Sequence, residues 1–399
     1  MATHRRRRVF ADRRRRGPRL RRFRRPRAGH HAVSRSAAST CTAARADARR
    51  QQLPVGLRRA LSTRRNSRSA EVGQQIIREH AGSRLPLNYF AIPFGLSGIA
   101  GSWTLAAPAL GAPTVIGLAL WAIAAAAWLS VLGAYAWRGL RAEGSLLADL
   151  RHPFLGPFAS LAPVVAILLG GAMAHVWPLG AGILVGAGVV VIGILSAWLL
   201  AEWMTGSVDA HVFHPANFLT ILAGGLIGAI GLAQIGARIL ALVAFCIGIF
   251  FWAVLAAVVL ARLTAIEKLP GALIPTLAIF SVPPSVAGIA WFAINGEHID
   301  WIQQTLLGLT LFLLLSQAFL VRNYARVPFG IGYWSFTFTV AAPATYGIHW
   351  LWLTQPSGWA AWSWLILGAV TLWIGWIAVW SAIDAAQSAI HMARSLAHR

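Results

Sequence analysis

The stretch of sequence that decides the fold begins at Pro86 and ends at Trp137. It reads PLNYFAIPFGLSGIAGSWTLAAPALGAPTVIGLALWAIAAAAWLSVLGAYAW and contains no Asp, Glu, Lys or Arg. A transmembrane helix needs about 20 predominantly apolar residues, so this stretch is long enough for two of them. Pro108, Gly111 and Pro113 form a turn signal near its middle. The stretch therefore predicts two membrane-spanning helices joined by a short turn.

Further stretches without charge follow along the chain. They cover residues 152–201, 210–237, 239–261, 269–296, 301–321 and 327–383. The first and last of these are again long enough for two spans each, with turn signals at 177–180 and 355–358. The predicted spans are 88–108, 114–137, 156–176, 181–203, 215–235, 239–261, 272–294, 301–321, 330–352 and 359–382. A β-barrel is a poor alternative, because its strands are about ten residues long and alternate in polarity.

The charged residues divide the chain into regions. Residues 1–85 hold 25 of the 35 basic side chains and 4 of the 12 acidic ones, whereas residues 86–399 hold 10 and 8. We therefore expect an Arg-rich, disordered arm (1–85), a ten-helix transmembrane domain (86–385) and a short cytoplasmic tail (386–399). The sparsely charged body cannot be an ordinary soluble domain, in which about a quarter of residues are charged.

The loop charges predict the orientation of the body in the membrane. With the arm in the cytoplasm, basic residues crowd the cytoplasmic side and only Arg238 lies on the opposite side. The cytoplasmic set is Arg138, Arg141, Arg151, Arg262, Lys268, Arg322, Arg326, Arg394 and Arg399. Since cytoplasmic loops are enriched in Lys and Arg, both termini are predicted to lie on the cytoplasmic side of a bacterial inner membrane.

The arm itself leaves three interpretations open. It is disordered or lies upstream of the true start (no Met occurs between Met1 and Met173), it contacts anionic lipid, or it is a targeting segment. Its Arg clusters are not interleaved with aromatic residues that could stack on bases, so no specific nucleic-acid partner is predicted.

Prolines distinguish the odd-numbered spans from the even-numbered ones. Pro93, Pro163, Pro283 and Pro343 fall inside spans one, three, seven and nine, Pro215 opens span five, and Pro275 and Pro284 add to span seven. An interior proline frees a backbone carbonyl, which finds a partner more easily inside a protein than against lipid. We therefore expect kinked odd spans around a pore and even spans facing lipid. The alternative is that proline is simply common in membrane helices.

Ionisable chemistry is absent from the centres of the predicted spans, which contain no Asp, Glu, Lys or Arg. Coupled transporters and pumps usually keep such a group there, so its absence favours passive movement through a pore of uncharged groups. His211 and His214 are three residues apart but lack a third well-spaced ligand. With no catalytic motif either, we predict neither an enzyme nor a metal or cofactor site.

Four motifs carry a resemblance to a known family. They are Asn88-Tyr-Phe-Ala-Ile-Pro-Phe-Gly-Leu-Ser97, His214-Pro-Ala-Asn-Phe-Leu219, Leu273-Ile-Pro-Thr-Leu-Ala-Ile-Phe-Ser-Val-Pro-Pro284 and Gly332-Tyr-Trp-Ser-Phe-Thr-Phe338. In order and spacing they resemble the tellurite-resistance/C4-dicarboxylate transporter family, which includes bacterial TehA proteins and the slow anion channels of plant guard cells. Thr220 replaces a proline that is usual in the second motif.

The resemblance implies five tandem helical hairpins around a central pore, assembled as a homotrimer, and a voltage-independent channel for small inorganic or organic anions. It also implies a phenylalanine gate, which aligns with Phe338. Phe336 is a packing candidate two residues away. The other pore-lining or kink candidates are Phe90, Pro93, Gly95, Gly98, Pro163, Pro215, Asn217, Pro283, Pro284 and Pro343. The alternative function is a proton-coupled carrier of C4-dicarboxylates or of oxyanions such as tellurite or sulfite.

Overall fold

The structure, a computed structural model, describes residues 85–397 except 142–144, 153, 206–212 and 266–268. All of these belong to one unit of the chain, Asn66–Arg399. They form helices and the turns between them, with no strand among them. The predicted arm, apart from Leu85, lies outside the described residues.

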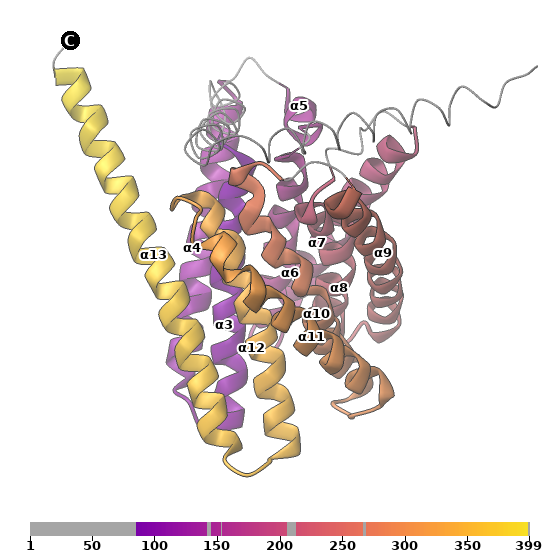
Figure 1. Ribbon diagram of the computed structural model, residues 1–399. Helices are drawn as coiled ribbons and strands as arrows, with labels where there is room; N and C mark the ends of the chain where they lie inside the picture. The colour runs from indigo at the N-terminus through magenta and orange to yellow at the C-terminus, as the bar shows by residue number, and fades with distance from the viewer. Residues whose placement is uncertain (1–84, 142–144, 153, 206–212, 266–268, 398–399) are drawn as a thin grey trace, which may run out of the picture. The chain divides into compact units, whose positions relative to one another are not determined.

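The helices follow one another in a repeating order. Five times, a 3₁₀ helix (η) leads into an α-helix, which a second α-helix follows (Figure 1). In chain order they are η1 (Leu87–Phe90), α3 (Ala91–Leu110), α4 (Thr114–Gly139), α5 (Leu146–Leu150), η2 (Gly156–Ser160), α6 (Leu161–Ala172), α7 (Pro178–Met204), η4 (Pro215–Asn217), α8 (Phe218–Gln234), α9 (Arg238–Ala265), η5 (Gly271–Ser281), α10 (Pro283–Asn295), α11 (Trp301–Tyr324), η6 (Ile331–Trp334), α12 (Ser335–Thr354) and α13 (Trp359–Ala397).

Eight of the described helical segments are long and apolar enough to cross a membrane. They are Leu87–Leu110, Thr114–Gly139, Pro178–Met204, Pro215–Gln234, Arg238–Ala265, Gly271–Asn295, Trp301–Tyr324 and Trp359–Ser388. At the place of the third predicted span, Gly156–Ala172 is apolar but shorter, and at the place of the ninth, α12 is long enough but less apolar. The part of the chain that the structure describes is therefore all-helical, and its long apolar helices are those of a multi-pass membrane protein.

Burial alternates along the chain between two sets of helices. We call α3, α6, α8, α10 and α12 the inner helices, and α4, α7, α9, α11 and α13 the outer helices. Buried residues make up 56, 83 and 72% of the apolar stretches that contain α3, α8 and α10, against 11 to 22% in the five outer helices. No described residue of an inner helix is among the exposed large apolar side chains. The outer helices therefore present an apolar surface that needs lipid as its solvent.

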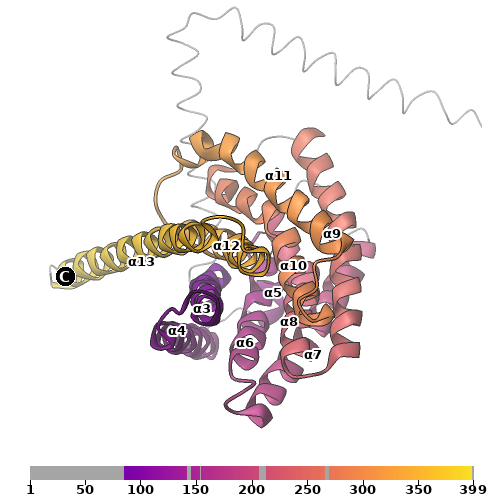
Figure 2. The same cartoon turned by 90° about the horizontal axis from the view of Figure 1, so that it is seen from below.

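The inner helices form a closed ring. Each contacts the next one along the chain, from α3 through α6, α8 and α10 to α12, and α12 returns to contact α3. Figure 2 shows this ring end-on, with outer helices on its periphery. Each inner helix also packs against the outer helix that directly follows it in sequence. The core between the inner helices thus lies on the axis of the ring.

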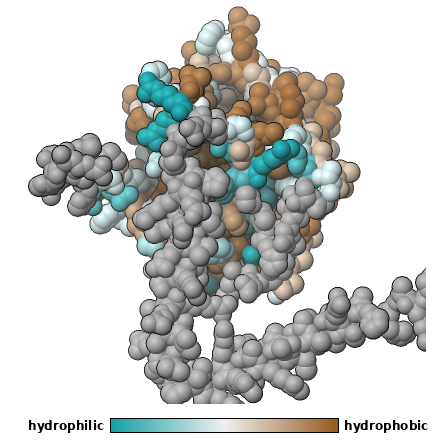
Figure 3. Space-filling model, turned by 90° about the horizontal axis from the view of Figure 1, so that it is seen from above, coloured by the Kyte–Doolittle hydropathy of each residue, from teal (hydrophilic) through white to brown (hydrophobic). Residues whose placement is uncertain are grey.

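The 3₁₀ segments form a second closed ring at one end of the inner helices. Segment η1 contacts η2, and contacts continue through η4, η5 and η6 back to η1. Figure 3 views the molecule from this end and shows hydrophilic residues among apolar ones. Arg151 donates a hydrogen bond of 2.8 Å to Glu202 here, at the ends of α5 and α7. Because a 3₁₀ segment of this ring precedes each inner helix, the structural repeat is a 3₁₀–α–α unit rather than a simple pair of helices.

The prolines correct the prediction of kinks inside the odd spans. Pro93 and Pro163 lie in the first turns of α3 and α6, directly after a 3₁₀ segment, and Pro215 opens η4. Pro283 and Pro284 are the first two residues of α10, so only Pro343 of the predicted set lies deep inside an α-helix. Proline has no N–H, and the start of a helix leaves that donor unused. These residues therefore mark where a helix begins or changes type.

Glycines allow the first and last inner helices to approach closely. A Cβ on Gly95 would clash with Oγ1 and Cβ of Thr337 on α12, and a Cβ on Gly98 would lie 3.0 Å from the Phe338 ring. Thr337 is fully buried in this contact and donates a 2.7 Å hydrogen bond to the Trp334 carbonyl. Because α12 must reach α3 for the ring to close, Gly95 and Gly98 serve the fold as well as the axis.

The last helix is longer than its predicted span. Helix α13 continues past residue 382 to Ala397 and so includes most of the predicted tail, 386–399. Figure 1 shows its C-terminal part extending beyond the ends of the neighbouring helices. The absence of glycine and proline after Gly375 explains the continuation, since neither helix-breaking residue interrupts it.

Candidate functional site

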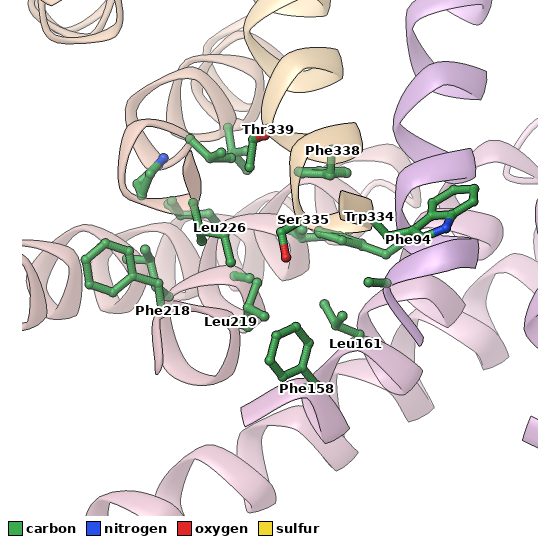
Figure 4. Close-up of a pocket in the computed structure, with 18 residues that line it drawn as sticks. Phe94, Phe158, Leu161, Phe218, Leu219, Leu226, Trp334, Ser335, Phe338 and Thr339 are labelled. Atoms are coloured by element: carbon green, nitrogen blue, oxygen red, sulfur yellow. The ribbon is translucent and has the colours of Figure 1, made fainter. Parts of the chain in front are cut away.

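A cavity of about 50 Å³ lies on the axis of the inner ring, and all five inner segments contribute to its wall. Its lining residues are Ala91 and Phe94 from α3, Phe158 and Leu161 from η2 and α6, Phe218, Leu219, Leu222, Ala223, Leu226 and Ile227 from α8, Ile279, Val282, Pro283 and Val286 from η5 and α10, and Trp334, Ser335, Phe338 and Thr339 from η6 and α12 (Figure 4). The cavity therefore forms because the five inner segments close into a ring, and no single pair of helices could form it.

Phe338 lies in the wall of this cavity and is held there by the aromatic side chain of Phe94. Its ring stacks on that of Phe94, with centroids 3.8 Å apart and planes inclined by 17°. One turn further along α3, the missing Cβ of Gly98 leaves room for the Phe338 ring. Aromatic pairs contribute about 0.5–1.5 kcal/mol beyond their burial, so contact with Phe94 helps to hold the Phe338 ring in place.

A second cavity, of about 60 Å³, lies at the level of the 3₁₀ ring. Both cavities are lined by Ala91, Phe158 and Ser335, which therefore stand at the boundary between them. The second cavity is more polar than the first, because Asn88, His152 and Thr276 also line it. The two cavities follow one another along the axis, with the more polar one at the 3₁₀ end.

His152 and His214 have matching structural roles at this end of the molecule. His152 Nδ1 accepts hydrogen bonds from the backbone N–H groups of Phe154 and Leu155, at 3.2 and 3.0 Å. His214 Nδ1 accepts from the N–H of Ala216 at 3.3 Å and caps η4. Both rings thus satisfy orphan donors at the start of an inner segment. His211, the other histidine of the metal pair considered above, lies outside the described residues.

The opposite end of the inner ring is held by a network of uncharged and charged groups. Tyr346 donates a 2.6 Å hydrogen bond to Gln303 Oε1, and Asp300 accepts from the Gln303 N–H at 2.9 Å and the Trp291 indole at 2.8 Å. Partial burial raises the pKa of Asp300, but these hydrogen bonds lower it by a larger amount. The pKa of Asp300 therefore falls below its ordinary value. Asp300 therefore stays ionised as the N-cap of α11.

Charge is absent from the axial cavity. None of its lining residues is ionisable, and the only side chains there with polar oxygen atoms are Ser335 and Thr339. Many of the described charged residues lie at helix ends or in turns, as Arg238, Glu297 and Arg322 do, and Asp384 lies in the C-terminal half of α13. An ion in this cavity would meet apolar side chains, aromatic rings and two hydroxyl groups.

Several predicted site residues lie elsewhere. Phe90 is buried against the Tyr135 ring of α4, at 6.1 Å, and lines neither cavity. Phe336 packs between Tyr324, at 4.9 Å, and Trp373 on the outer side of α12. Asn217 accepts a 2.8 Å hydrogen bond from the backbone N–H of His214 and completes a capping box.

The other predicted residues have mixed positions. Pro283 lines the axial cavity, whereas Pro93, Pro163, Pro215, Pro284 and Pro343 do not. Gly95 and Gly98 lie beside α12 and do not line the cavity themselves. They lie next to Trp334 and Phe338, which do line it. A backbone kink and a pore-lining position are therefore separate properties, and the proline pattern indicates only which helices are inner.

Sequence reasoning missed most of the cavity wall. Phe94 and Phe158 were not singled out, nor were Phe218 and Trp334, although each contributes an aromatic ring. One signal was available for Phe94, Phe218 and Trp334, since each lies inside a motif quoted above, whereas Phe158 lies in none of them. A histidine–proline pair precedes both Phe158 and Phe218, at 152–153 and 214–215, but Phe158 lies inside η2 whereas Phe218 is the first residue of α8.

Comparison with known proteins now identifies the family. The sequence model of the SLAC1 family, described as voltage-dependent anion channel, matches residues 84–382. The chain belongs to the SLAC1 family. The match includes all the inner helices and the outer helices as far as residue 382 of α13, so the family resemblance drawn from the four motifs is confirmed.

Individual members of the SLAC1 family extend this match. The chain is 26% identical over 264 residues to the tellurite resistance protein TehA homolog of Haemophilus influenzae, over 65% of this chain and 79% of that protein. It is 25% identical to the S-type anion channel SLAH3 of Arabidopsis thaliana, over 65% of this chain and 42% of the relative. With SLAH2 of the same plant the identity is 27%, over 66% and 52%. The chain thus spans about half the length of these plant relatives, or less.

Proposed function

We propose that this protein is a passive channel or facilitator for small anions, with ten membrane spans arranged as five hairpins around a central pore. The observation that carries the proposal is the axial cavity, which all five inner segments line and which contains no ionisable residue. A pore lined by uncharged groups lets an ion pass down its gradient without a coupling site. SLAC1-family membership makes the ion an anion.

In this proposal Phe338 is the gate. Its ring stands in the wall of a cavity of only about 50 Å³ and stacks on Phe94. An ion that passes an aromatic ring in so narrow a space must shed water that the ring does not replace with hydrogen bonds, which raises its barrier. Opening then requires a change of the Phe338 rotamer or a movement of α12 away from α3.

The measurement that tests the proposed activity is the reversal potential of the purified protein in a planar bilayer under a chloride gradient. We expect the reversal potential to follow the chloride equilibrium potential, because the pore passes anions and excludes cations. A reversal potential at the cation equilibrium value would reject the proposal. Absence of current, together with dicarboxylate uptake into vesicles driven by a proton gradient, would replace it with the coupled carrier.

We also propose that conduction depends only weakly on voltage, although the family description speaks of voltage dependence. Moving one elementary charge across the membrane contributes about 2.3 kcal/mol per 100 mV, so steep gating requires charges within the field. The described spans carry charge only near their ends. Current–voltage curves in symmetrical chloride are expected to be close to linear. Steep rectification that persists when both solutions are identical would contradict this.

The remaining parts of the proposal concern place and assembly. We infer a bacterial inner membrane with both termini in the cytoplasm, from the excess of basic residues at the 3₁₀ end. We also infer a homotrimer, from the family resemblance. Membrane topology can be checked with reporter fusions at the C-terminus, and the trimer by mass measurement of the detergent-solubilised protein.

A further inference from the structure

The C-terminal end of outer helix α4 combines two exposed arginines with exposed apolar side chains. Arg138 lies in the last turn of α4, and Arg141 lies in the turn directly after the helix. Leu140, between them in the chain, is 85% exposed. Because α4 is an outer helix with an apolar surface, its end lies where that surface meets the water phase.

The Arg141 guanidinium is held in place by an aromatic ring. It lies over the ring of Trp137, 4.0 Å from the ring centre. Trp137 is itself 58% exposed, which is typical of a tryptophan at the boundary between lipid and water. A guanidinium that lies over an indole ring keeps N–H groups at its edge that can donate to another acceptor. Trp137 therefore holds Arg141 at the level of the lipid headgroups.

The two arginines form no ion pair within the part of the chain that the structure describes. The acidic side chains Asp149 and Glu202, at the same end of the molecule, have other partners. Asp149 accepts a 2.7 Å hydrogen bond from Tyr135, and Glu202 pairs with Arg151 at 2.8 Å. Two like charges three residues apart repel each other. An anion between the two guanidinium groups removes this repulsion, so the end of α4 favours a negatively charged ligand.

The face of α4 that leads to the arginines is apolar and uncovered. Leu129, Gly133, Ala136 and Leu140 follow one another at spacings of four, three and four residues and so share one helix face. All four are exposed, and a Cβ on Gly133 would meet no atom within 4 Å. At 1.5 Å per residue the face is about 16 Å long, about half of the ~30 Å hydrocarbon core. It therefore fits the acyl chain of a lipid in one leaflet.

We propose that the end of α4 binds one anionic phospholipid, with the lipid phosphate at Arg138 and Arg141 and an acyl chain along the leucine face. The planar guanidinium groups match the oxygen atoms of a phosphodiester. An anionic headgroup is favoured over a zwitterionic one, because the latter brings an ammonium group close to two positive charges. A soluble phosphate would leave the apolar face uncovered. Lipid binding is independent of the proposed channel activity, since α4 lines neither cavity.

Thermal unfolding of the purified full-length protein in dodecyl maltoside, with added phosphatidylglycerol, tests the site. We expect this lipid to raise the unfolding midpoint of the wild type, because a ligand that binds only the folded state stabilises it. Arg138→Gln/Arg141→Gln is expected to need about ten-fold more lipid for half of the stabilisation, since it lacks both charges. The matched control is Arg322→Gln/Arg326→Gln, which removes the same charge from exposed arginines at the end of α11. It is expected to respond as the wild type does.

A further variant tests the role of the aromatic ring. Trp137→Leu keeps both charges but no longer holds Arg141, so it is expected to need about three-fold more lipid. Equal weakening in the two double variants would mean that net charge alone attracts the lipid and would disprove the site. The same holds if phosphatidylglycerol does not stabilise the wild type, or if glycerol 3-phosphate stabilises it equally well. Without added lipid, the wild type and the arginine variants are expected to unfold at the same midpoint, which separates lost binding from a folding defect.

Discussion

Replacing Phe338 by alanine is expected to raise the single-channel anion current at least about tenfold. The ring occupies the wall of a narrow axial cavity and is fixed by its stacking on Phe94 at 3.8 Å. Removing it widens the passage and lets the ion keep more of its water. A barrier lower by about 1.4 kcal/mol suffices for a tenfold change in rate, and the cost of stripping one unsatisfied polar contact is already of that size.

The control for this experiment is Phe336→Ala, which removes an identical side chain from the opposite face of the same helix. Phe336 packs against Tyr324 and Trp373, so its loss is expected to lower stability while leaving the conductance close to that of the wild type. Equal increases in both variants would mean that a loosened α12, and not the missing ring, opens the pore. An unchanged current in Phe338→Ala would remove Phe338 from the gate.

The substitution Gly95→Ala is expected to give the largest loss of stability. The added Cβ would overlap Oγ1 and Cβ of the buried Thr337, whose position is set by its hydrogen bond to Trp334. The α3–α12 contact closes the inner ring, so a forced separation there affects every element of the cavity. Overpacking of this kind costs about 1–3 kcal/mol or more. The check is the fraction of detergent-solubilised protein that stays monodisperse after heating.

Two further variants make this test specific. Gly101→Ala lies on the same helix, but its Cβ would meet no atom within 4 Å, so stability is expected to be unchanged or slightly raised. Combining Gly95→Ala with Thr337→Gly transfers the small residue to the other helix and is expected to recover most of the loss. If Gly95→Ala behaves like Gly101→Ala, the close approach of α3 and α12 is not what holds the ring together.

The fold was largely predictable because its main signal is local. Stretches without charge indicate where a helix can lie in lipid, and the structure places helix ends within a few residues of the predicted ones at most boundaries, as at Thr114 and Trp301. The exceptions have physical causes. Helix α13 runs on to Ala397, since no residue stops it, and α6 ends at Ala172, before Trp177 and Pro178. The division into inner and outer helices was also visible in the sequence, because the prolines of the predicted set fall in the inner segments. Most of these prolines mark helix starts and not kinks.

The candidate site was less predictable. Phe338 and Pro283 were identified from motifs, whereas the cavity wall also needs Phe94, Phe158 and Trp334 from three separate segments. Phe90 lies in the same motif as Phe94, four residues earlier, and faces Tyr135 instead. Helical periodicity separates the faces of a helix but carries no information on which face meets the axis.

The amino-acid sequence by itself determined that this chain contains a series of apolar stretches with no Asp, Glu, Lys or Arg at their centres. Those properties depend on composition along the chain, because the lipid core accommodates only long apolar segments whose backbone groups are hydrogen-bonded within the helix. Only the tertiary structure decided that Phe338 lines the axial cavity and Phe336 does not, and that Ser335 and Thr339 line the same cavity. The reason is that α12 must return to α3 to close the ring, and this contact between distant segments sets the rotation of α12 about its own axis.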